Sequence, residues 1–288
     1  MKVVTFNIRC DYGQDGLNEF ANRKELILRK INQEKPDIIG FQEVLPHVAK
    51  WLKENLNEYY VIGCGRGANL RDEQMSIAYR RDRINLISMK TWWLSQTPDV
   101  PGSRYEEQSS CPRTATDAVF EDIKNDKVFR FINTHLDHIG AQAREKGLTQ
   151  IINQLKQERF WKDIPVILCG DFNAEPNAPE MEIISRDSSF NNLTKDIGIT
   201  FHGYYKNDPN DPPCSIDYIV LKGDWQCETV YKWTDEENGI YRIWKDTTSC
   251  IQDVSWYMGN RRCRMGFLFR RKPDGCDQGS SRLWNQFY

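Results

Sequence analysis

Polar side chains that could bind a cation and a phosphate group fall where short apolar runs of the sequence end. Asn7, Glu43, His135 and Asp171 each close such a run, and Asp217 instead begins one. These groups are costly to bury without partners, which favours a site where several of them meet. Carboxylate and amide oxygens are the ligands that Mg²⁺ prefers. The pattern therefore suits the binding of a cation and a phosphate.

The residue types allow a division of labour in phosphate ester hydrolysis. Glu43 can anchor Mg²⁺, which keeps several water molecules for a phosphate to displace. Asp171 can orient and deprotonate an attacking water, and the amide of Asn173 can hold that carboxylate in place. His135 can donate to a non-bridging phosphate oxygen and stabilise the charge that develops there.

Each of these residues also has a simpler explanation when it is taken alone. Glu43 can be a solvated strand end, and Asp171 with Asn173 can satisfy the backbone of their own turn. His135 can be a hydrogen-bonded, partly buried histidine, and Asp217 a strand-end cap. Only the combination of these residues indicates a functional site.

The elements that must position these residues alternate between strands and helices. The helical spacing of Leu148, Ile151, Ile152 and Leu155 gives one apolar face. The run 166–169 is apolar throughout, as in strands that are covered on both faces. Two sheets packed together, with helices outside, satisfy both patterns. The predicted strands are 3–8, 37–42, 60–62, 76–80, 84–94, 115–121, 128–134, 166–170 and 216–221.

Several short motifs, in this order, resemble the endonuclease/exonuclease/phosphatase superfamily, which has the deoxyribonuclease I-like fold. They are Pro36 to Glu43, Asn133 to His135 with Arg144 after it, Val166 to Asn173, and Ser215 to Tyr218. Any one of these motifs is uninformative, whereas their joint occurrence at these spacings is specific. The resemblance covers residues 1–241, which we expect to form one domain.

The resemblance implies a four-layer α/β sandwich, with two central mixed β-sheets flanked by helices and the active site at one edge. It implies that Asn7 and Glu43 lie at the metal and that His135 contacts phosphate. Asp171 and Asn173 are expected to handle the nucleophilic water, and Asp217 to orient a second histidine.

At three further residues the sequence resembles a bacterial-type subgroup of this superfamily. The resemblance implies that these residues bind substrate or phosphate: Asp137, His138 and Arg144. A long segment, residues 95–112, is rich in Pro, Gly, Ser and charged residues and follows the sequence Trp92-Trp93-Leu94-Ser95. Long ordered loops are often functional, so this loop is expected to influence substrate choice.

The sequence departs from the superfamily after residue 241. Members usually end with a Ser-Asp-His triplet that supplies a central catalytic histidine, but no histidine follows His202. Residues 242–288 carry a net charge of +5, against −7 for the preceding part, and contain no Ala, Glu or His. We therefore expect an atypical basic tail that supplies no strand to finish a sheet.

Three explanations of this tail stay open. It can be a shifted reading frame or an unrelated segment, so that a final strand and a catalytic loop are missing. It can be a genuine basic appendage that binds nucleic acid through Trp244, Trp256, Trp284 and the cluster 261–264. It can also be an irregular cap with solvated arginines.

Composition limits the partners. The formal net charge of −2 gives no broad basic surface for duplex DNA, so a nucleic-acid partner is not indicated by charge. No signal peptide or membrane segment is visible, and the nine cysteines contain no Cys-x-x-Cys pair, so a cytoplasmic location is expected. The sequence does not indicate an oligomeric state.

The leading functional hypothesis is a phosphoesterase that depends on Mg²⁺ or Mn²⁺. Its substrate would be a small phosphodiester or phosphomonoester, a sugar or lipid head group, or a nucleic-acid end. The alternative is a relative that binds phosphate and metal but lacks turnover, because the last catalytic histidine is missing. A third hypothesis is an interaction protein that recruits partners through the tail.

Overall fold

The computed structural model describes residues 1–203, 212–234, 236–241 and 249–256. Its first sheet has six strands, and only the central pair β1 and β2 is parallel. The strand order is β11 (Trp225–Lys232), β14 (Ser249–Trp256), β1 (Val3–Asn7), β2 (Ile38–Val44), β4 (Gln74–Arg80) and β3 (Tyr59–Ile62).

The second sheet also has six strands and one parallel pair, β7 with β8. Its strand order is β5 (Ile84–Trp93), β6 (Thr114–Asp122), β7 (Lys127–His135), β8 (Val166–Asp171), β10 (Asp217–Lys222) and β9 (Phe190–Asn192). A separate two-stranded ribbon pairs β12 (Glu236–Glu237) with β13 (Ile240–Tyr241). Both large sheets are mixed, as expected from the sequence.

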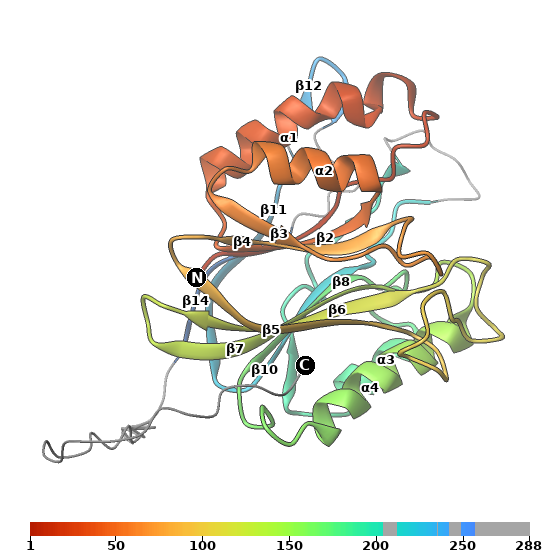
Figure 1. Cartoon of the computed structure of the whole chain (residues 1–288), viewed down its shortest axis with the longest axis vertical. Helices are drawn as coiled ribbons and strands as arrows, with labels where there is room; N and C mark the ends of the chain where they lie inside the picture. The colour runs from red at the N-terminus through yellow and green to blue at the C-terminus, as the bar shows by residue number, and fades with distance from the viewer. Residues whose placement is uncertain (204–211, 235, 242–248, 257–288) are drawn as a thin grey trace, which may run out of the picture. The chain divides into compact units, whose positions relative to one another are not determined.

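Helices cover the outer face of each sheet (Figure 1). The first sheet is covered by α1 (Phe20–Glu34) and α2 (Pro46–Asn55). The second is covered by α3 (Ala141–Gln157) and the short α4 (Glu182–Ser185). Two single-turn 3₁₀ helices, η1 (Gly16–Asn18) and η2 (Pro179–Met181), precede α1 and α4.

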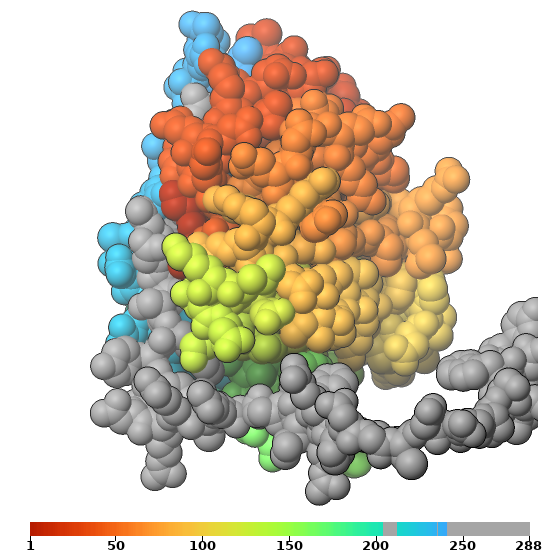
Figure 2. Space-filling model, turned by 60° about the vertical axis from the view of Figure 1, so that its left-hand side comes forward, coloured from red at the N-terminus to blue at the C-terminus, as the bar shows by residue number. Residues whose placement is uncertain are grey.

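Three separate groups of buried apolar side chains hold these layers together. One lies between the first sheet and its helices, and includes Phe6, Ile27 and Leu52. Another lies between the second sheet and α3, and a third joins the inner faces of the two sheets. Figure 2 shows the N-terminal segments, in red and orange, packed against the yellow and yellow-green segments that follow them in the chain. The four-layer α/β sandwich is thereby confirmed.

The helix positions follow from local sequence signals. In α3 the predicted stripe Leu148, Ile151, Ile152 and Leu155 is buried. α2 begins with Pro46, which suits the first turn because proline lacks the N–H that would be unpaired there. α1 ends at Glu34, and its C-cap residue Lys35 takes a left-handed backbone conformation just before Pro36.

All nine predicted strands are present, but five strands were missed: β9, β11, β12, β13 and β14. The expectation that no strand follows residue 241 is wrong, because β14 pairs antiparallel with both β1 and β11. Its sequence, Ser-Cys-Ile-Gln-Asp-Val-Ser-Trp, has no clean apolar alternation, and backbone pairing on both edges compensates for the weak pattern. The expected domain boundary at residue 241 stays a prediction.

Residues 242–248, where the Ser-Asp-His triplet was expected, lie outside the described residues, as do Trp244, Trp284 and the basic cluster 261–264. Among the helices that the structure describes, none has the length and apolar character needed to span a membrane.

Candidate metal and phosphate site

The carboxyl ends of the two parallel strand pairs meet at one edge of the sandwich. Glu43 comes from β2, while His135 and Asp171 end β7 and β8 as partners in register. All three side chains are buried, and their ligand atoms lie within 4.8 Å of one another. Opposite ligands of a Mg²⁺ ion are about 4.2 Å apart, since each bond is about 2.1 Å. The donor set therefore fits a divalent cation, and of the two residues predicted at the metal, Glu43 and Asn7, it includes Glu43.

Asn7, at the end of β1, connects the two carboxylates. Its Nδ2 donates to Glu43 Oε1 at 2.7 Å and to Asp171 Oδ2 at 2.9 Å, and Asn7 is fully buried. Its Oδ1 accepts the backbone N–H of Arg9 at 2.9 Å. Asn7 thus lies at the predicted position, and in this arrangement its amide nitrogen rather than its oxygen faces the acids.

A distortion of β2 aims Glu43 into the site. The register with β4 shifts between Phe41 and Val44, as in a β-bulge, and Glu43 has a left-handed φ of 61°. Its Oε2 accepts the backbone N–H of Cys10 at 2.8 Å and lies 3.0 Å from the Cys10 thiol. Burial, and then the charge of Glu43, raise the pKa of Cys10, so this thiol stays protonated and donates.

Asp171 and Asn173 form a tight turn after β8. Asp171 Oδ1 accepts the backbone N–H of Asn173 at 3.0 Å, and Asn173 has a left-handed φ of 49°. Asn173 Nδ2 donates to Leu136 O at 3.0 Å and lies 2.9 Å from His135 Nε2. Because that amide group is a donor, His135 Nε2 accepts from it. The predicted donation from His135 to phosphate would need that nitrogen to be released.

Asp217 begins β10 and is the register partner of Asp171. It is fully buried, and its Oδ2 accepts the hydroxyl of Thr200 at 2.9 Å. It therefore stands beside the site, as predicted. The chain has only four histidines, and none follows His202, so the histidine that Asp217 was expected to orient has no counterpart after β10.

Asp137, predicted to bind phosphate, anchors the loop 95–112, and its role toward phosphate stays a prediction. Its carboxylate accepts from Ser109 Oγ at 2.5 Å and Ser109 N at 3.2 Å, and from the backbone of Ile139 and Gly140. Burial raises the pKa of Asp137, but these hydrogen bonds outweigh it and hold the pKa below its usual value. With four donors already bound, an anionic phosphate is a poor further partner.

Arg144, on the first turns of α3, is also engaged internally. Its Nε donates to Glu180 Oε1 at 2.6 Å, and its Nη1 donates to the backbone oxygen of Asp137 at 3.1 Å. These contacts tie α3 to η2 and to the segment after β7. A role for Arg144 in phosphate binding stays a prediction, as it does for His138, whose exposed ring lies at the edge of the site.

A buried polar network joins the two sheets directly beneath the site. Gln42 Nε2 donates to Asn133 Oδ1 at 2.6 Å, and Asn133 Nδ2 donates to Phe41 O and Ser76 O. Gly40 lies against it, since a Cβ there would stand 2.9 Å from Asn133 Oδ1. This network sets the spacing of β2 and β7, and hence of Glu43 and His135.

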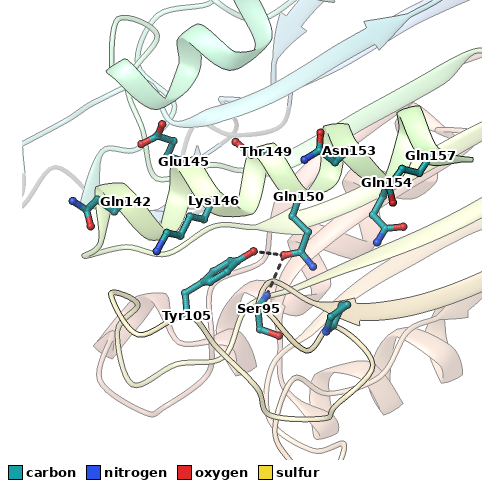
Figure 3. Close-up of a pocket in the computed structure, with 11 residues that line it drawn as sticks. Ser95, Tyr105, Gln142, Glu145, Lys146, Thr149, Gln150, Asn153, Gln154 and Gln157 are labelled. Atoms are coloured by element: carbon teal, nitrogen blue, oxygen red, sulfur yellow. Dashed lines mark hydrogen bonds between the residues drawn. The ribbon is translucent and has the colours of Figure 1, made fainter.

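The loop 95–112 also borders a polar pocket of about 550 Å³ on the side of α3 (Figure 3). Gln150 fixes the loop there, because its Oε1 accepts from the Tyr105 hydroxyl at 2.8 Å and from Ser95 N at 3.1 Å. The lining residues include none of the candidate site residues. The pocket is therefore separate from the candidate site. The loop 95–112 borders the pocket and also contacts Asp137 through Ser109.

Sequence reasoning missed several charged residues around the site. Arg66 donates to Glu73 Oε1 at 2.8 Å, and both residues are about 5% exposed or less. Burial, followed by the charge of Glu43, raises the pKa of Glu73 to about 7. Arg113 is buried beside Asp137 and His138. None of these residues ends an apolar run, so periodicity gave no signal for them.

The two helix-covered mixed sheets form an α/β sandwich, and their strand ends converge on a Glu, His and Asp cluster that could hold a metal ion. The sequence profile of the Endonuclease/Exonuclease/phosphatase family matches residues 4–255. The chain belongs to this family. The match extends into β14, which agrees with the strand found there.

Individual relatives agree with this assignment. The chain is similar to an endonuclease/exonuclease/phosphatase of Bacteroides vulgatus, with 28% identity, a TM-score of 0.80, and coverage of 89% of this chain and 98% of the other. It is similar to a mannosyl-6-phosphatase of Bacteroides thetaiotaomicron, with 25% identity, a TM-score of 0.78, and coverage of 90% and 100%. It is also 28% identical to Drosophila melanogaster Nocturnin over 179 residues. That alignment covers 56% of this chain and 25% of Nocturnin.

Proposed function

We propose that this protein is a phosphoesterase that uses a divalent cation, Mg²⁺ or Mn²⁺, to hydrolyse a phosphate ester. The observation that carries the proposal is the meeting of Glu43, His135 and Asp171 within 4.8 Å at the strand ends. Three buried, titratable side chains in one place are expensive for a fold, and such clusters are typical of functional sites. Family membership gives this cluster its chemical context.

Glu43 would hold the cation, with the Asp171 carboxylate beside it. The bound cation would neutralise charge on the phosphate and on the departing oxygen. Glu43 is already fixed by Asn7 and Cys10, so its carboxylate needs no reorganisation to bind. This preorganisation supports the predicted metal role of Glu43.

Asp171 would orient the attacking water and accept its proton. Two hydrogen bonds, from Asn7 Nδ2 and Asn173 N, fix its carboxylate in one orientation. His135 Nε2 lies 3.6 Å from Asp171 Oδ2, so the imidazole borders the same space. To donate to a phosphate there, Nε2 would have to carry a proton and give up the hydrogen bond that it accepts from Asn173, which links substrate binding to the position of the Asn173 side chain.

A small phosphorylated molecule, such as a sugar phosphate, is the substrate class that we favour. The described part of the chain is acidic overall, so long duplex DNA is poorly matched to it. Similarity to a mannosyl-6-phosphatase supports a sugar phosphate. A nucleic-acid end stays a second substrate to test.

A second candidate function is phosphate and metal binding without turnover. The observation in its favour is the absence of any histidine after His202. Removing one member of a catalytic unit commonly lowers the rate by several orders of magnitude, while the cation site can survive.

Hydrolysis of bis-p-nitrophenyl phosphate and p-nitrophenyl phosphate, with Mg²⁺, Mn²⁺ or EDTA, separates the two functions. We expect cation-dependent release that Asp171→Asn lowers at least about 100-fold in kcat, since the variant cannot take a proton. Asp122→Asn is the matched control, because Asp122 is a buried acid at the far end of β6. Cation binding by calorimetry without any release would establish the non-catalytic function instead.

A further inference from the structure

Arg113 is a buried arginine beside the candidate site. It precedes β6, at the end of the loop 95–112, and is 3% exposed. Its Nε lies 3.6 Å from Asp137 Oδ1, and its Nη2 lies 2.8 Å from His138 Nδ1. Asp137, Arg113 and His138 therefore form a chain of contacts that runs from a buried carboxylate to an exposed imidazole.

The contact with Arg113 fixes which nitrogen of His138 carries a proton. A guanidinium has only N–H donors and keeps its charge in proteins. His138 Nδ1 must therefore accept, and its single proton lies on Nε2. Burial and the charges of Arg113 and Arg66 lower the pKa of His138 against the opposite effect of Asp137 and Glu43. Both arguments give a neutral imidazole at pH 7.

The ion pair with Asp137 leaves part of the Arg113 guanidinium without a hydrogen bond. Within the described part of the chain, its Nε and Nη1 have no hydrogen-bond acceptor, although both atoms are buried. Unpaired buried donors of a charged group destabilise a fold. Asp137 is already held by Ser109, Ile139 and Gly140, so the loop is anchored without Arg113. The well-formed contact of Arg113 is the one with His138.

We propose that Arg113 is a positioning residue that locks His138 as a neutral Nε2–H donor for an oxygen of the substrate. An Nε2–H imidazole whose Nδ1 is occupied has no free lone pair, so His138 does not join Glu43 in holding the cation. His138 follows His135, the last residue of β7, by three positions and is exposed, so it is accessible to a ligand bound at the site. The substrate contact rests on the proposed function, whereas the tautomer does not.

The tautomer is measurable in the full chain without any substrate. Long-range ¹H–¹⁵N spectra of ¹⁵N-histidine-labelled protein contain signals from four histidines, and His138→Gln identifies the His138 signals. We expect the Nε2–H form at pH 7. An Nδ1–H form or a charged ring in the wild-type protein would overturn the proposal, and this measurement needs no Arg113 variant to fold.

Two variants then test the cause. Arg113→Met should release His138 to a mixture of tautomers and raise its pKa, since one cationic neighbour is lost. Arg130→Met is the matched control. Arg130, in β7, is also 3% exposed, but it pairs with Asp117 of the neighbouring strand β6 and not with His138. An unchanged His138 spectrum in a folded Arg113→Met variant would show that Arg113 does not set the tautomer.

Phosphate titration tests the substrate contact. With Mg²⁺ present, inorganic phosphate should shift the His138 Nε2–H signal, and no shift at saturating phosphate would refute that part of the proposal. In kinetics, Arg113→Met should raise the KM for p-nitrophenyl phosphate about tenfold, with less effect on kcat, as for other residues that orient a ligand. If the wild-type protein shows no hydrolysis, the proposed function fails while the tautomer result still stands.

Discussion

Replacing Gly170 with alanine should destabilise the protein more than any other single methyl addition near the site. Gly170 precedes Asp171 in β8 and has a φ of +147°, a conformation that L-residues rarely adopt. A Cβ there would lie 1.9 Å from the backbone oxygen of Thr134, in the neighbouring strand β7. That carbonyl cannot move without separating the strands that carry Asp171 and His135.

The expected cost has two parts. Backbone strain at positive φ contributes about 1–2 kcal/mol, and overpacking contributes about 1–3 kcal/mol. The free energy of unfolding should therefore fall by about 2–5 kcal/mol, a large share of a typical total of about 5–15 kcal/mol. The site should lose activity as well, since relief of the overlap moves Asp171 relative to His135.

Two other glycines separate the contributions. Gly13 has a φ of +72° and no atom within 4 Å of its added Cβ, so Gly13→Ala should cost about 1–2 kcal/mol from strain alone. At Gly40, which is outside the positive-φ region, the Cβ would lie 2.7 Å from Cys169 Sγ, so overpacking acts alone. Urea unfolding of the three variants measures each cost. A smaller loss for Gly170→Ala than for Gly13→Ala would refute the reasoning.

Three other predictions concern the site and its supports. Glu43→Gln should raise the Mg²⁺ concentration needed for half-maximal hydrolysis about tenfold or more, because a neutral amide binds a hard cation weakly, and metal titration of the rate would measure it. His135→Ala should raise KM and lower kcat together in the hydrolysis assay. Equally small effects of His135→Ala, Glu43→Gln and Asp171→Asn would show that these residues do not form the active site. Burial raises the pKa of Glu34, but hydrogen bonds from Lys30, Lys2 and Tyr231 outweigh it and lower the pKa to about 2. Because a carboxylate with a lowered pKa stabilises the fold above its unfolded pKa, this contribution is present above about pH 4.5 and is lost as the pH falls toward 2. Glu34→Gln should therefore lower the urea midpoint at pH 7, with a difference from wild type that shrinks by pH 3; an undiminished difference at pH 3 would contradict the assignment.

The sequence predicted the layers well because apolar periodicity reports burial directly. The stripe in α3 and the fully apolar run in β8 are buried as expected. It failed at β11 and β14, which form the edge of the first sheet and the strand beside it. β11 alternates between intermediate and exposed positions, so it carries little apolar signal. Strand pairing at such positions depends on the partner backbone, which sequence alone does not display.

The candidate site was likewise predictable from the sequence only in part. Asn7, Glu43, His135 and Asp171 were predictable because each stands at the end of an apolar strand. The contact of Asp137 with the loop was not predictable, since its partner Ser109 is distant in sequence. Arg113 gave no signal for the same reason: its importance comes from the position of His138, 25 residues away.

Three of the eight non-glycine residues with left-handed φ angles in the described part of the chain lie at this edge. They are Arg9, Glu43 and Asn173, with φ angles of 65°, 61° and 49°. Glu43 belongs to the cluster, Asn173 contacts His135, and Arg9 donates to Asn7, which in turn donates to Glu43 and Asp171. Each such conformation costs about 1–3 kcal/mol, which a fold retains only where the surroundings over-determine it. Here the strain turns the Glu43 carboxylate and the Asn173 amide into one small space, together with Asp171. A fold selected for stability alone has no reason to crowd two carboxylates there, whereas a site that must hold a cation against a phosphate does.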